Sequence, residues 1–490
     1  MSTPSNATQR DDTRKDLRDG ARAAIIGALA PIDGVRSVRF VGSYWEADAT
    51  TAPGDVDVVV ILSTLTRPRF EACRAAVRAL GGHVFGLPGL PVQINDTFGP
   101  QKLGAGDQIV VHLMIYDVAS HRAHVLASPF TCLDWERVDH GYGPSLRETY
   151  PVAPIAPPAL LDARRGVANY LEDLNAGTVS VRSYTWNVDR TASLAVQQIS
   201  LDARNRGEFA VHVVKHLLTN LTKVLTGRNE PLTDDALAAA WARWVPSSAA
   251  LCPEYLAMLA AKRSGVAEYA PRAVDVAIEF AAGFAAALDA LIEALPRIVW
   301  IRHAATALND GTFLGQGRDP SVADAAAIAP LAGQWVRVQS STARRALETA
   351  VRLAPGVPVT HDLRLAEIDY GAAEGLTYAD LAEQFPAVVR DWQSGGDAAF
   401  PGGECHGDVL ARLDAAIRDL TQLSGSALVV THNVVLRTLL GSRLNIPRHD
   451  WHRIPVDHVD PIESFVIGDR VVPYLAPARL GAILDCGVGA

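Results

Sequence analysis

The chain has 490 residues, of which 49% are hydrophobic and 20% are charged, and its formal net charge is −9. This length predicts about three domains, and the acidic balance excludes a general electrostatic attraction to nucleic acid or to an anionic membrane surface. The five cysteines are scattered without paired spacing, and residues 1–19 are polar with no apolar core. Both features predict a reduced, cytoplasmic protein without a zinc site or a signal peptide.

The first predicted domain covers residues 14–151 and has the alternation of an α/β domain. A helix is expected over Asp16–Leu29, and runs rich in β-branched residues predict strands at Val35–Val41, Asp55–Leu62 and Gln108–Asp117.

Polar and small residues stand at the end of the first of these strands and at the start of the second. Asp55 and Asp57 alternate along one strand, so their carboxylates point to the same face and repel each other unless a cation lies between them. Mg²⁺ prefers oxygen ligands and is the expected cation. Gly42 would let the backbone approach a triphosphate, and Ser43 could donate a hydrogen bond to it.

These residues resemble the nucleotidyltransferase superfamily, which has the polymerase-β-like fold, over Val35–Leu62 and more loosely to Val118. The resemblance implies Mg²⁺-dependent transfer from a nucleoside triphosphate to a small molecule, with a third carboxylate on a later strand. His112 stands inside the expected strand where that acid would lie, and Asp96 and Asp117 are the other candidates. Without a third carboxylate the domain would bind a nucleotide and not transfer it.

Residues 152–295 are predicted to form a helical module. Segments with apolar residues at helical spacing are Leu160–Asn175, Ala192–Ala203, Phe209–Leu225, Asp235–Trp244 and Val274–Leu295. Arg206 and His212 have the spacing seen in a class of helical ribonuclease domains, and His212 and His216 are four residues apart, as two metal ligands can be. The alternative is that all three are packing and surface positions of one helix.

The third predicted domain, residues 296–490, places polar groups directly after apolar strands. Ile298–Ile301 precedes Arg302 and His303, and Ala427–Val430 precedes a second histidine, His432. Open α/β sheets bind ligands at such carboxyl ends of strands, so we expect a three-layer α/β/α domain with its site there.

Histidines and arginines in this arrangement suit phosphoryl transfer. A neutral His303 could attack phosphorus, while Arg302, Arg345 and a protonated His432 would clamp the phosphoryl oxygens. Glu367 would protonate the leaving oxygen and then activate water. No metal is expected at this site, because side chains supply the positive charge.

At these residues the chain resembles the histidine phosphatase superfamily, in its phosphoglycerate mutase-like branch. The matching motifs are Arg302-His303-Ala304, Ser340–Ala350, Glu367–Gly371 and Val429–Asn433. The resemblance selects Arg345 as the helix arginine, and it implies that Thr306, Asn309 and Asn433 help to bind the phosphate.

Together these features predict a bifunctional enzyme that joins a phosphomonoesterase to a nucleotidyltransferase acting on a small molecule, as in nucleotide-sugar or modified-nucleoside metabolism. The expected partners are a small phosphomonoester and a nucleoside triphosphate. The alternatives are a phosphatase regulated by a non-catalytic nucleotide-binding domain, a phosphomutase, and an RNA-acting protein built on Arg206 and His212. The oligomeric state is left open.

Overall fold

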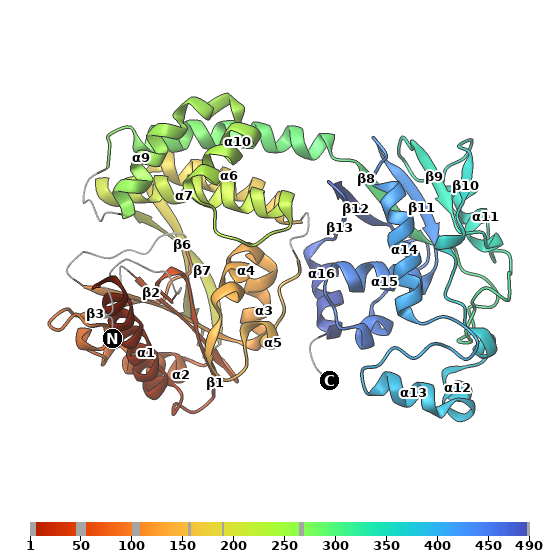
Figure 1. The fold of residues 1–490 in the computed structure, drawn as a ribbon, viewed down its shortest axis with the longest axis horizontal. Coiled ribbons are helices and arrows are strands. Elements are labelled where there is room, and N and C mark those ends of the chain that lie inside the picture. Colours follow the sequence, from red (N-terminus) through yellow and green to blue (C-terminus); the bar gives the residue numbers. More distant parts are fainter. Residues whose placement is uncertain are drawn as a thin grey trace, which may run out of the picture. The chain divides into compact units, whose positions relative to one another are not determined.

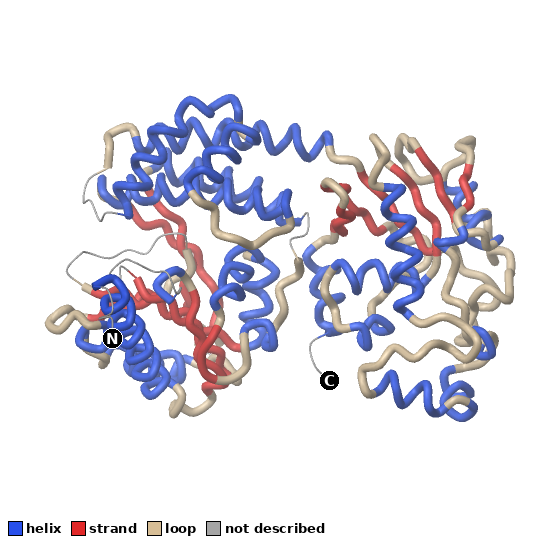
Figure 2. Tube along the Cα trace, in the orientation of Figure 1, coloured by secondary structure: helices blue, strands red, loops and turns tan. Residues whose placement is uncertain are grey.

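The computed structural model describes residues 6–45, 55–99, 108–154, 158–188, 191–263 and 269–487. Contacts divide the chain into two compact units, each with helices and strands (Figure 1; Figure 2). The first unit comprises Met1–Val152 and Leu161–Asp289, and the second comprises Ala153–Leu160 and Ala290–Ala490. The chain is therefore a mixed α/β multidomain protein, and the further division expected near residue 151 stays a prediction.

The first unit contains a five-stranded sheet in the order β3-β4-β2-β1-β5. Its strands are β1 (Val35–Val41), β2 (Asp55–Leu62), β3 (Val92–Asn95), β4 (Ile109–Asp117) and β5 (His140–Tyr142). β4 is parallel to both β2 and β3, whereas β1 is antiparallel to both β2 and β5. The first two strands have the bounds that the β-branched runs predict.

Five helices accompany this sheet: α1 (Asn6–Leu29), α2 (Arg67–Arg78), α3 (Val118–Ala127), α4 (Pro129–Val138) and α5 (Leu146–Thr149). α1 buries Ala21, Ile25 and Leu29 in the core because residues four apart lie on one helix face. Asp117 ends β4 and caps α3, since its carboxylate accepts a hydrogen bond from the Ser120 backbone N–H at 2.9 Å.

The rest of the first unit is formed mainly by helices: α6 (Pro158–Ala176), α7 (Ala203–Thr226), α8 (Asp234–Trp244), α9 (Cys252–Arg263) and α10 (Ala273–Ala294). The helix expected over Ala192–Ala203 is wrong. Those residues form strand β7 (Ala192–Ser200), which pairs along its whole length with β6 (Thr178–Trp186). In β6, the alternating residues Val179 and Val181 are buried. Pairing with β6 holds Ala192–Ser200 as a strand and outweighs the helical spacing of its apolar residues.

The second unit has a six-stranded sheet in the order β10-β9-β11-β8-β12-β13. Its strands are β8 (Arg297–Arg302), β9 (Arg337–Ser340), β10 (Val359–His361), β11 (Ala427–Thr431), β12 (Ile462–Ile467) and β13 (Arg470–Tyr474). The first four are mutually parallel, and β12 is antiparallel to both of its neighbours.

Both faces of this sheet are covered by helices. Val299, Ile301 and Val430 point to the face where α11 (Arg344–Leu353) packs, and they share its apolar core. The side chains that alternate with these along the strands, such as Trp300, point to the opposite face and are also buried. On that face α15 (Asn433–Arg443) contacts β8. The result is the expected three-layer α/β/α arrangement.

The remaining helices of the second unit are α12 (Tyr378–Gln384), α13 (Pro386–Gln393), α14 (His406–Leu420) and α16 (Pro477–Leu484). A 3-10 helix, η6 (Arg448–Arg453), follows α15 and packs against it. Over the described ranges of the chain, no helix combines the length and the apolar character needed to span a bilayer.

Candidate active site

The pairing of two central strands places His303 and His432 side by side. β8 and β11 are parallel, with Arg302 opposite Thr431, so each strand is followed at once by a histidine. The His303 backbone N–H donates to the Thr431 carbonyl oxygen at 2.9 Å, and the two imidazole centroids are 5.1 Å apart. Both rings are buried at the carboxyl end of the sheet, where the sequence predicts the site.

His303 is held as a neutral ring with one nitrogen available. Its Nδ1–H donates to the Ala304 carbonyl oxygen at 2.8 Å, which leaves the lone pair on Nε2. Burial lowers the pKa of His303 to about 3, and the nearby guanidinium groups of Arg345 and Arg302 act in the same direction. The ring is thus unprotonated at neutral pH.

Two arginines bring fixed positive charge to this ring. Arg345 is only 1% exposed, and its terminal nitrogens donate to the Gly315 carbonyl oxygen at 2.8 Å and the Arg318 carbonyl oxygen at 3.2 Å. Arg302 donates to the Val456 carbonyl oxygen at 2.8 Å. Within the described part of the chain, the buried Nε of each arginine has no hydrogen-bond partner. A buried donor without a partner is unfavourable, so an anion bound here would stabilise both groups.

Glu367 supplies the carboxyl group of the site. Its Oε1 accepts hydrogen bonds from the backbone N–H of Ile368 at 3.0 Å and of Val434 at 3.2 Å. Burial raises the pKa of Glu367 above its ordinary value, against the opposing effect of the Ile368 N–H and of Arg345, Arg302 and Arg412. The Val434 N–H also lies 3.4 Å from Oε2, so the backbone holds both oxygens of the carboxyl group in place.

His432 is fully buried and shares a 2.6 Å hydrogen bond between its Nε2 and the Ser341 hydroxyl. Burial, and then the neighbouring His303, lower the pKa of His432 well below its usual range. This shift disfavours the imidazolium form of the buried ring, and protonation of His432 beside a bound phosphate stays a prediction.

The three additional phosphate-binding candidates lie next to these groups in the chain. Asn309 uses its side-chain oxygen to accept from the Thr306 backbone N–H at 2.7 Å and the Thr306 hydroxyl at 3.1 Å. Asn433 begins α15 directly after His432, and its side-chain oxygen has no partner among the described residues. Direct contact of these residues with phosphate stays a prediction.

His458 is a site residue that the sequence does not reveal. Its Nδ1–H donates to the His303 carbonyl oxygen at 2.6 Å, and the two ring centroids are 5.3 Å apart. It lies in a loop with no motif, 155 residues from its partner. No local pattern could have identified it.

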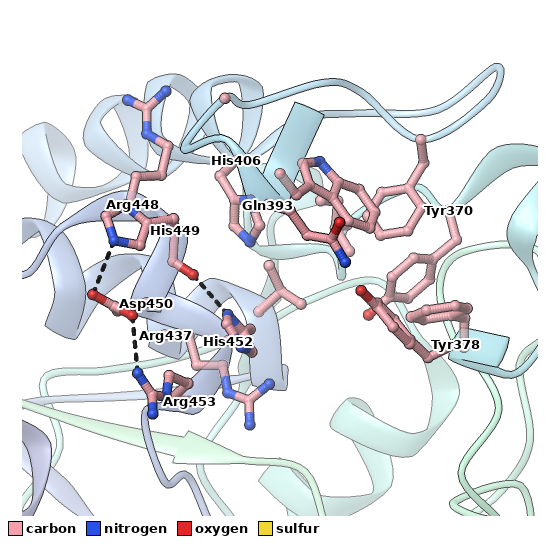
Figure 3. Close-up of a pocket in the computed structure, with 16 residues that line it drawn as sticks. Tyr370, Tyr378, Gln393, His406, Arg437, Arg448, His449, Asp450, His452 and Arg453 are labelled. Atoms are coloured by element: carbon pink, nitrogen blue, oxygen red, sulfur yellow. Dashed lines mark hydrogen bonds and ion pairs between the residues drawn. The ribbon is translucent and has the colours of Figure 1, made fainter. Parts of the chain in front are cut away.

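A cavity of about 720 Å³ lies next to Glu367. Ile368 and Val434, whose N–H groups hold the Glu367 carboxylate, are among its lining residues. Figure 3 shows basic side chains of α15 and η6 on one side and Tyr370 and Tyr378 across from them. The sequence motifs do not predict this cavity, because loops and short helices without a signature form it.

In the first unit, the residue opposite Asp57 on β4 is a histidine and not the third carboxylate that a nucleotidyltransferase site needs. His112 lies opposite Asp57 in the β2–β4 pairing, with Nδ1 3.0 Å from the Asp57 Oδ1 and Nε2 2.8 Å from the Thr97 carbonyl oxygen. Each ring nitrogen of His112 thus lies within hydrogen-bond distance of an oxygen atom. A histidine therefore stands where the third carboxylate was sought. Gly42 has a φ of 84°, and a side chain there would collide with the Asp57 carboxylate.

The other candidate acids serve other purposes. Asp117 caps α3, and Asp96 forms an ion pair with Arg74 at 2.8 Å. The side chain of Asp55 lies outside the described residues, and Ser43 begins a short 3-10 helix. Among side chains that the structure describes, no group of three histidines, cysteines or acids is placed to hold a metal. These residues alone do not complete a Mg²⁺ site, and Mg²⁺ binding stays a prediction.

The histidines of α7 fit the packing interpretation. The rings of His212 and His216 stack with centroids 5.3 Å apart, and the Asn220 amide donates to the His216 Nε2 at 2.9 Å. Burial lowers the pKa of His216 to about 4. Arg206 lies near the start of the same helix. The searched portion of the chain offers no third metal ligand here.

Comparisons with known proteins bear on the second unit. A family model described as histidine phosphatase superfamily, branch 1, matches residues 298–463. A glucosyl-3-phosphoglycerate phosphatase from Mycolicibacterium vanbaalenii is 32% identical over 175 residues, which cover 32% of this chain and 77% of the relative. A 6-phosphofructo-2-kinase/fructose-2,6-bisphosphatase from Caenorhabditis elegans is 32% identical over 185 residues, which cover 36% of this chain.

The chain spans 39% of the length of the Caenorhabditis elegans relative, so the similarity concerns only part of each protein. A solved mycobacterial glucosyl-3-phosphoglycerate phosphatase is similar with 25% identity and a TM-score of 0.31, covering 35% of this chain and 90% of that one. The family match includes both histidine strands and the intervening motifs. Through this C-terminal region, the chain belongs to the histidine phosphatase superfamily.

Proposed function

We propose that the second unit hydrolyses a small-molecule phosphomonoester through a phosphohistidine formed on His303. The observation that carries the proposal is the buried, neutral His303 ring, whose free Nε2 lies among two arginines with unpartnered buried donors. The names of two relatives, a glucosyl-3-phosphoglycerate phosphatase and a fructose-2,6-bisphosphatase, support a small phosphorylated substrate.

In the first step the His303 Nε2 attacks phosphorus, and the bond from phosphorus to the leaving oxygen breaks. Arg302 and Arg345 stabilise the negative charge on the phosphoryl oxygens. Glu367, whose pKa is raised by burial, donates its proton to the leaving oxygen. The alcohol departs, and the phosphoryl group remains on His303.

In the second step the Glu367 carboxylate accepts a proton from water as the water oxygen attacks the phosphohistidine. The phosphorus–nitrogen bond breaks, inorganic phosphate is released, and His303 regains its lone pair. Glu367 is protonated again and ready for another cycle. The site needs only positive charge and one acid–base group for this sequence, and its own side chains supply both.

Trapping the intermediate tests the proposal. After reaction with a ³²P-labelled phosphomonoester and a rapid alkaline quench, the wild-type protein should retain acid-labile label, and His303→Ala should retain none. We expect that variant to lose about 10³-fold or more in phosphate release, since the nucleophile is removed. His361→Ala, at an exposed histidine of the same unit, is the matched control. Equal release by His303→Ala and wild type would refute the assignment. Transfer of the label to a hydroxyl of a second substrate molecule in place of water would identify a phosphomutase.

A second candidate function belongs to the first unit, which we propose binds a nucleoside triphosphate near Gly42 and Asp57. The support is the close approach of the Gly42 backbone to the Asp57 carboxylate. In one version the domain transfers a nucleotidyl group, with Mg²⁺ held by Asp55 and Asp57. In the other it only binds the nucleotide and regulates the phosphatase, and the histidine that stands beside Asp57 in place of a third carboxylate favours this version.

A further inference from the structure

We infer that Ser341 is a positioning residue that fixes the neutral His432 ring with its proton on Nδ1, so that the ring offers an N–H donor to the phosphoryl group on His303. This inference rests on the proposed phosphatase function and adds a residue to the same site. Three features carry it: the fixed position of the Ser341 hydroxyl, the direction of its hydrogen bond to His432, and the second His432 nitrogen, which has no hydrogen-bond partner among the described residues.

Ser341 is held directly after β9 by its own backbone. It is completely buried, and its N–H donates to the Val430 carbonyl oxygen of β11 at 3.0 Å. The Ser340 hydroxyl donates to the Ser341 carbonyl oxygen at 2.9 Å. Since both backbone groups of Ser341 are bonded, its side chain starts from a fixed point. The pairing of β9 with β11 thus brings the serine to a histidine that is 91 residues away in the chain.

The Ser341 hydroxyl donates its proton to His432. Its oxygen lies 2.6 Å from the His432 Nε2, and it accepts a hydrogen bond from the Ala343 backbone N–H at 3.3 Å. A hydroxyl carries one proton, and among the described residues the His432 Nε2 is the only acceptor that this hydroxyl reaches. The hydroxyl proton therefore points to Nε2, and Nε2 accepts the hydrogen bond.

A neutral imidazole whose Nε2 accepts a hydrogen bond carries its own proton on Nδ1. The His432 Nδ1 is buried and has no hydrogen-bond partner in the part of the chain that the structure describes. A buried donor without a partner is unfavourable, so an oxygen atom of a ligand would stabilise it. The His303 ring, whose centroid is 5.1 Å away, would present such an oxygen once it carries a phosphoryl group.

The two histidines then hold the same tautomer but leave opposite nitrogens available. In His303 the Ala304 carbonyl oxygen accepts from the Nδ1–H, so the lone pair of Nε2 remains free. In His432 the Ser341 hydroxyl occupies the lone pair of Nε2, so the Nδ1–H remains free. One ring can therefore attack phosphorus while the other donates to a phosphoryl oxygen.

The surroundings of His432 suit a neutral donor. Burial is the main cause of its lowered pKa, and His303 and the nearby arginines act in the same direction. Arg302 and Arg345 would already supply positive charge to a bound phosphate. A neutral N–H adds a directional hydrogen bond without a further charge that must be desolvated. Ser341 supplies what the ring lacks by itself, which is a preference for one tautomer.

Removal of the hydroxyl tests its role. Ser341→Ala frees the ring to move its proton to Nε2, so we expect kcat for an alkyl phosphate to fall about 5–100-fold with little change in KM, as for one buried hydrogen bond that acts in the transition state. Ser464→Ala is the matched control and should keep the wild-type kcat. Ser464 is also a buried serine of the second unit, and its hydroxyl has no partner among the described residues. An unchanged kcat in Ser341→Ala would overturn the inference.

Coupling between the two side chains separates this role from packing alone. His432→Asn keeps an amide N–H near the position of Nδ1 and has no counterpart of Nε2. In that background Ser341→Ala should cost less than about twofold in kcat, whereas a serine needed only for packing would cost the same factor in both backgrounds.

A second comparison does not depend on how well Ser341→Ala folds. His432→Gln places its amide near the position of Nε2, so it lacks the donor that His432→Asn retains. We therefore expect kcat of His432→Asn to exceed that of His432→Gln by about fivefold or more. The reverse order would contradict a proton on Nδ1.

The proton can also be located directly. Neutron diffraction from a deuterated crystal of the wild-type protein with inorganic phosphate should show deuterium on the His432 Nδ1 and on the Ser341 hydroxyl, and none on the His432 Nε2. Deuterium on Nε2, alone or together with Nδ1, would overturn the inference while the phosphatase proposal stands. Failure of the wild-type protein to retain label on His303 would instead refute the phosphatase proposal, whatever the tautomer of His432.

Discussion

Burial acts in opposite directions on the two groups to which we assign phosphoryl and proton transfer in the second unit. It lowers the pKa of His303 to about 3 because it disfavours the imidazolium, and it raises the pKa of Glu367 because it disfavours the carboxylate. The base is therefore unprotonated and the acid retains its proton to higher pH than an exposed glutamate. Such opposed shifts suit nucleophilic attack and leaving-group protonation at one pH.

The pH dependence of kcat/KM should reflect these two shifts. Because His303 stays unprotonated down to about pH 3, acidification through pH 6.5, the ordinary histidine value, should not reduce kcat/KM. The rate should instead fall as pH rises through the raised pKa of Glu367, and this alkaline limb should be absent in Glu367→Gln. Profiles of both proteins on one alkyl phosphate provide the measurement. A histidine-like acidic limb near pH 6.5 would contradict the neutral nucleophile.

The importance of the acid should depend on the leaving group. Glu367→Gln keeps the shape of the side chain but has no proton to donate, so we expect a loss of about 10²–10⁴-fold in kcat for an alkyl phosphate. The loss should be much smaller for p-nitrophenyl phosphate, whose leaving group is stable as an anion. Steady-state assays of both esters decide the matter, with Glu383→Gln, on α12, as the control. A uniform loss on both would show that Glu367 acts in some other way.

At the scale of elements, α15 connects the phosphate pocket with the neighbouring cavity. Its first turn donates to Glu367, its second presents Arg437, and its last contacts η6, which carries Arg453. Gly441 lies at this last contact, where a Cβ atom would collide with the Trp451 ring.

Gly441→Ala should therefore destabilise the second unit. Alanine normally stabilises a helix relative to glycine by about 1 kcal/mol, but overpacking against Trp451 should cost about 1–3 kcal/mol and disturb its hydrogen bond to the Ile446 carbonyl oxygen. Urea unfolding measures the net loss. Gly27→Ala in α1, where the added Cβ meets open space, should instead raise the free energy of unfolding by about 0.5–1 kcal/mol. Stabilisation at both positions would mean that η6 adjusts without cost.

The parts of the structure that could be predicted from the sequence are runs of β-branched residues and short motifs of neighbouring residues. β1 and β2 are β-branched runs, and His303, Arg345 and His432 stand in short motifs at strand ends or a helix start. The β6–β7 hairpin was missed because non-local pairing selected the strand conformation over helical spacing. The wall of the cavity, with Arg437 and Arg453, could not be predicted, since tertiary folding brings these residues to the tyrosines from separate segments.

At the scale of the whole molecule, each unit has its own buried core, and each carries a candidate site. The first site contains one described carboxylate beside a histidine, whereas the second brings two histidines, two arginines and a glutamate together. Because of this contrast, the first question for experiment is whether a nucleotide added to the protein changes phosphate release by the second unit.

Addition of ATP with Mg²⁺ should separate the two versions of the first unit. If the unit regulates the phosphatase, the nucleotide should change phosphate release by about fivefold or more, the lower range of allosteric coupling, and Asp57→Asn should abolish the response. If the unit is a transferase, a nucleotidylated product should form that depends on Asp57 and survives His303→Ala. Mass spectrometry detects the product, and Asp16→Asn, at an exposed site on α1, is the control. Neither response nor product would make the nucleotide proposal wrong.

The bond from His458 to the carbonyl oxygen of His303 joins residues 155 positions apart in the chain. Contacts of such long range form late, because the intervening polypeptide must first be ordered. During refolding, catalytic turnover should therefore appear after helical circular dichroism has recovered. A nascent chain still attached to the ribosome before this loop emerges should be enzymatically silent.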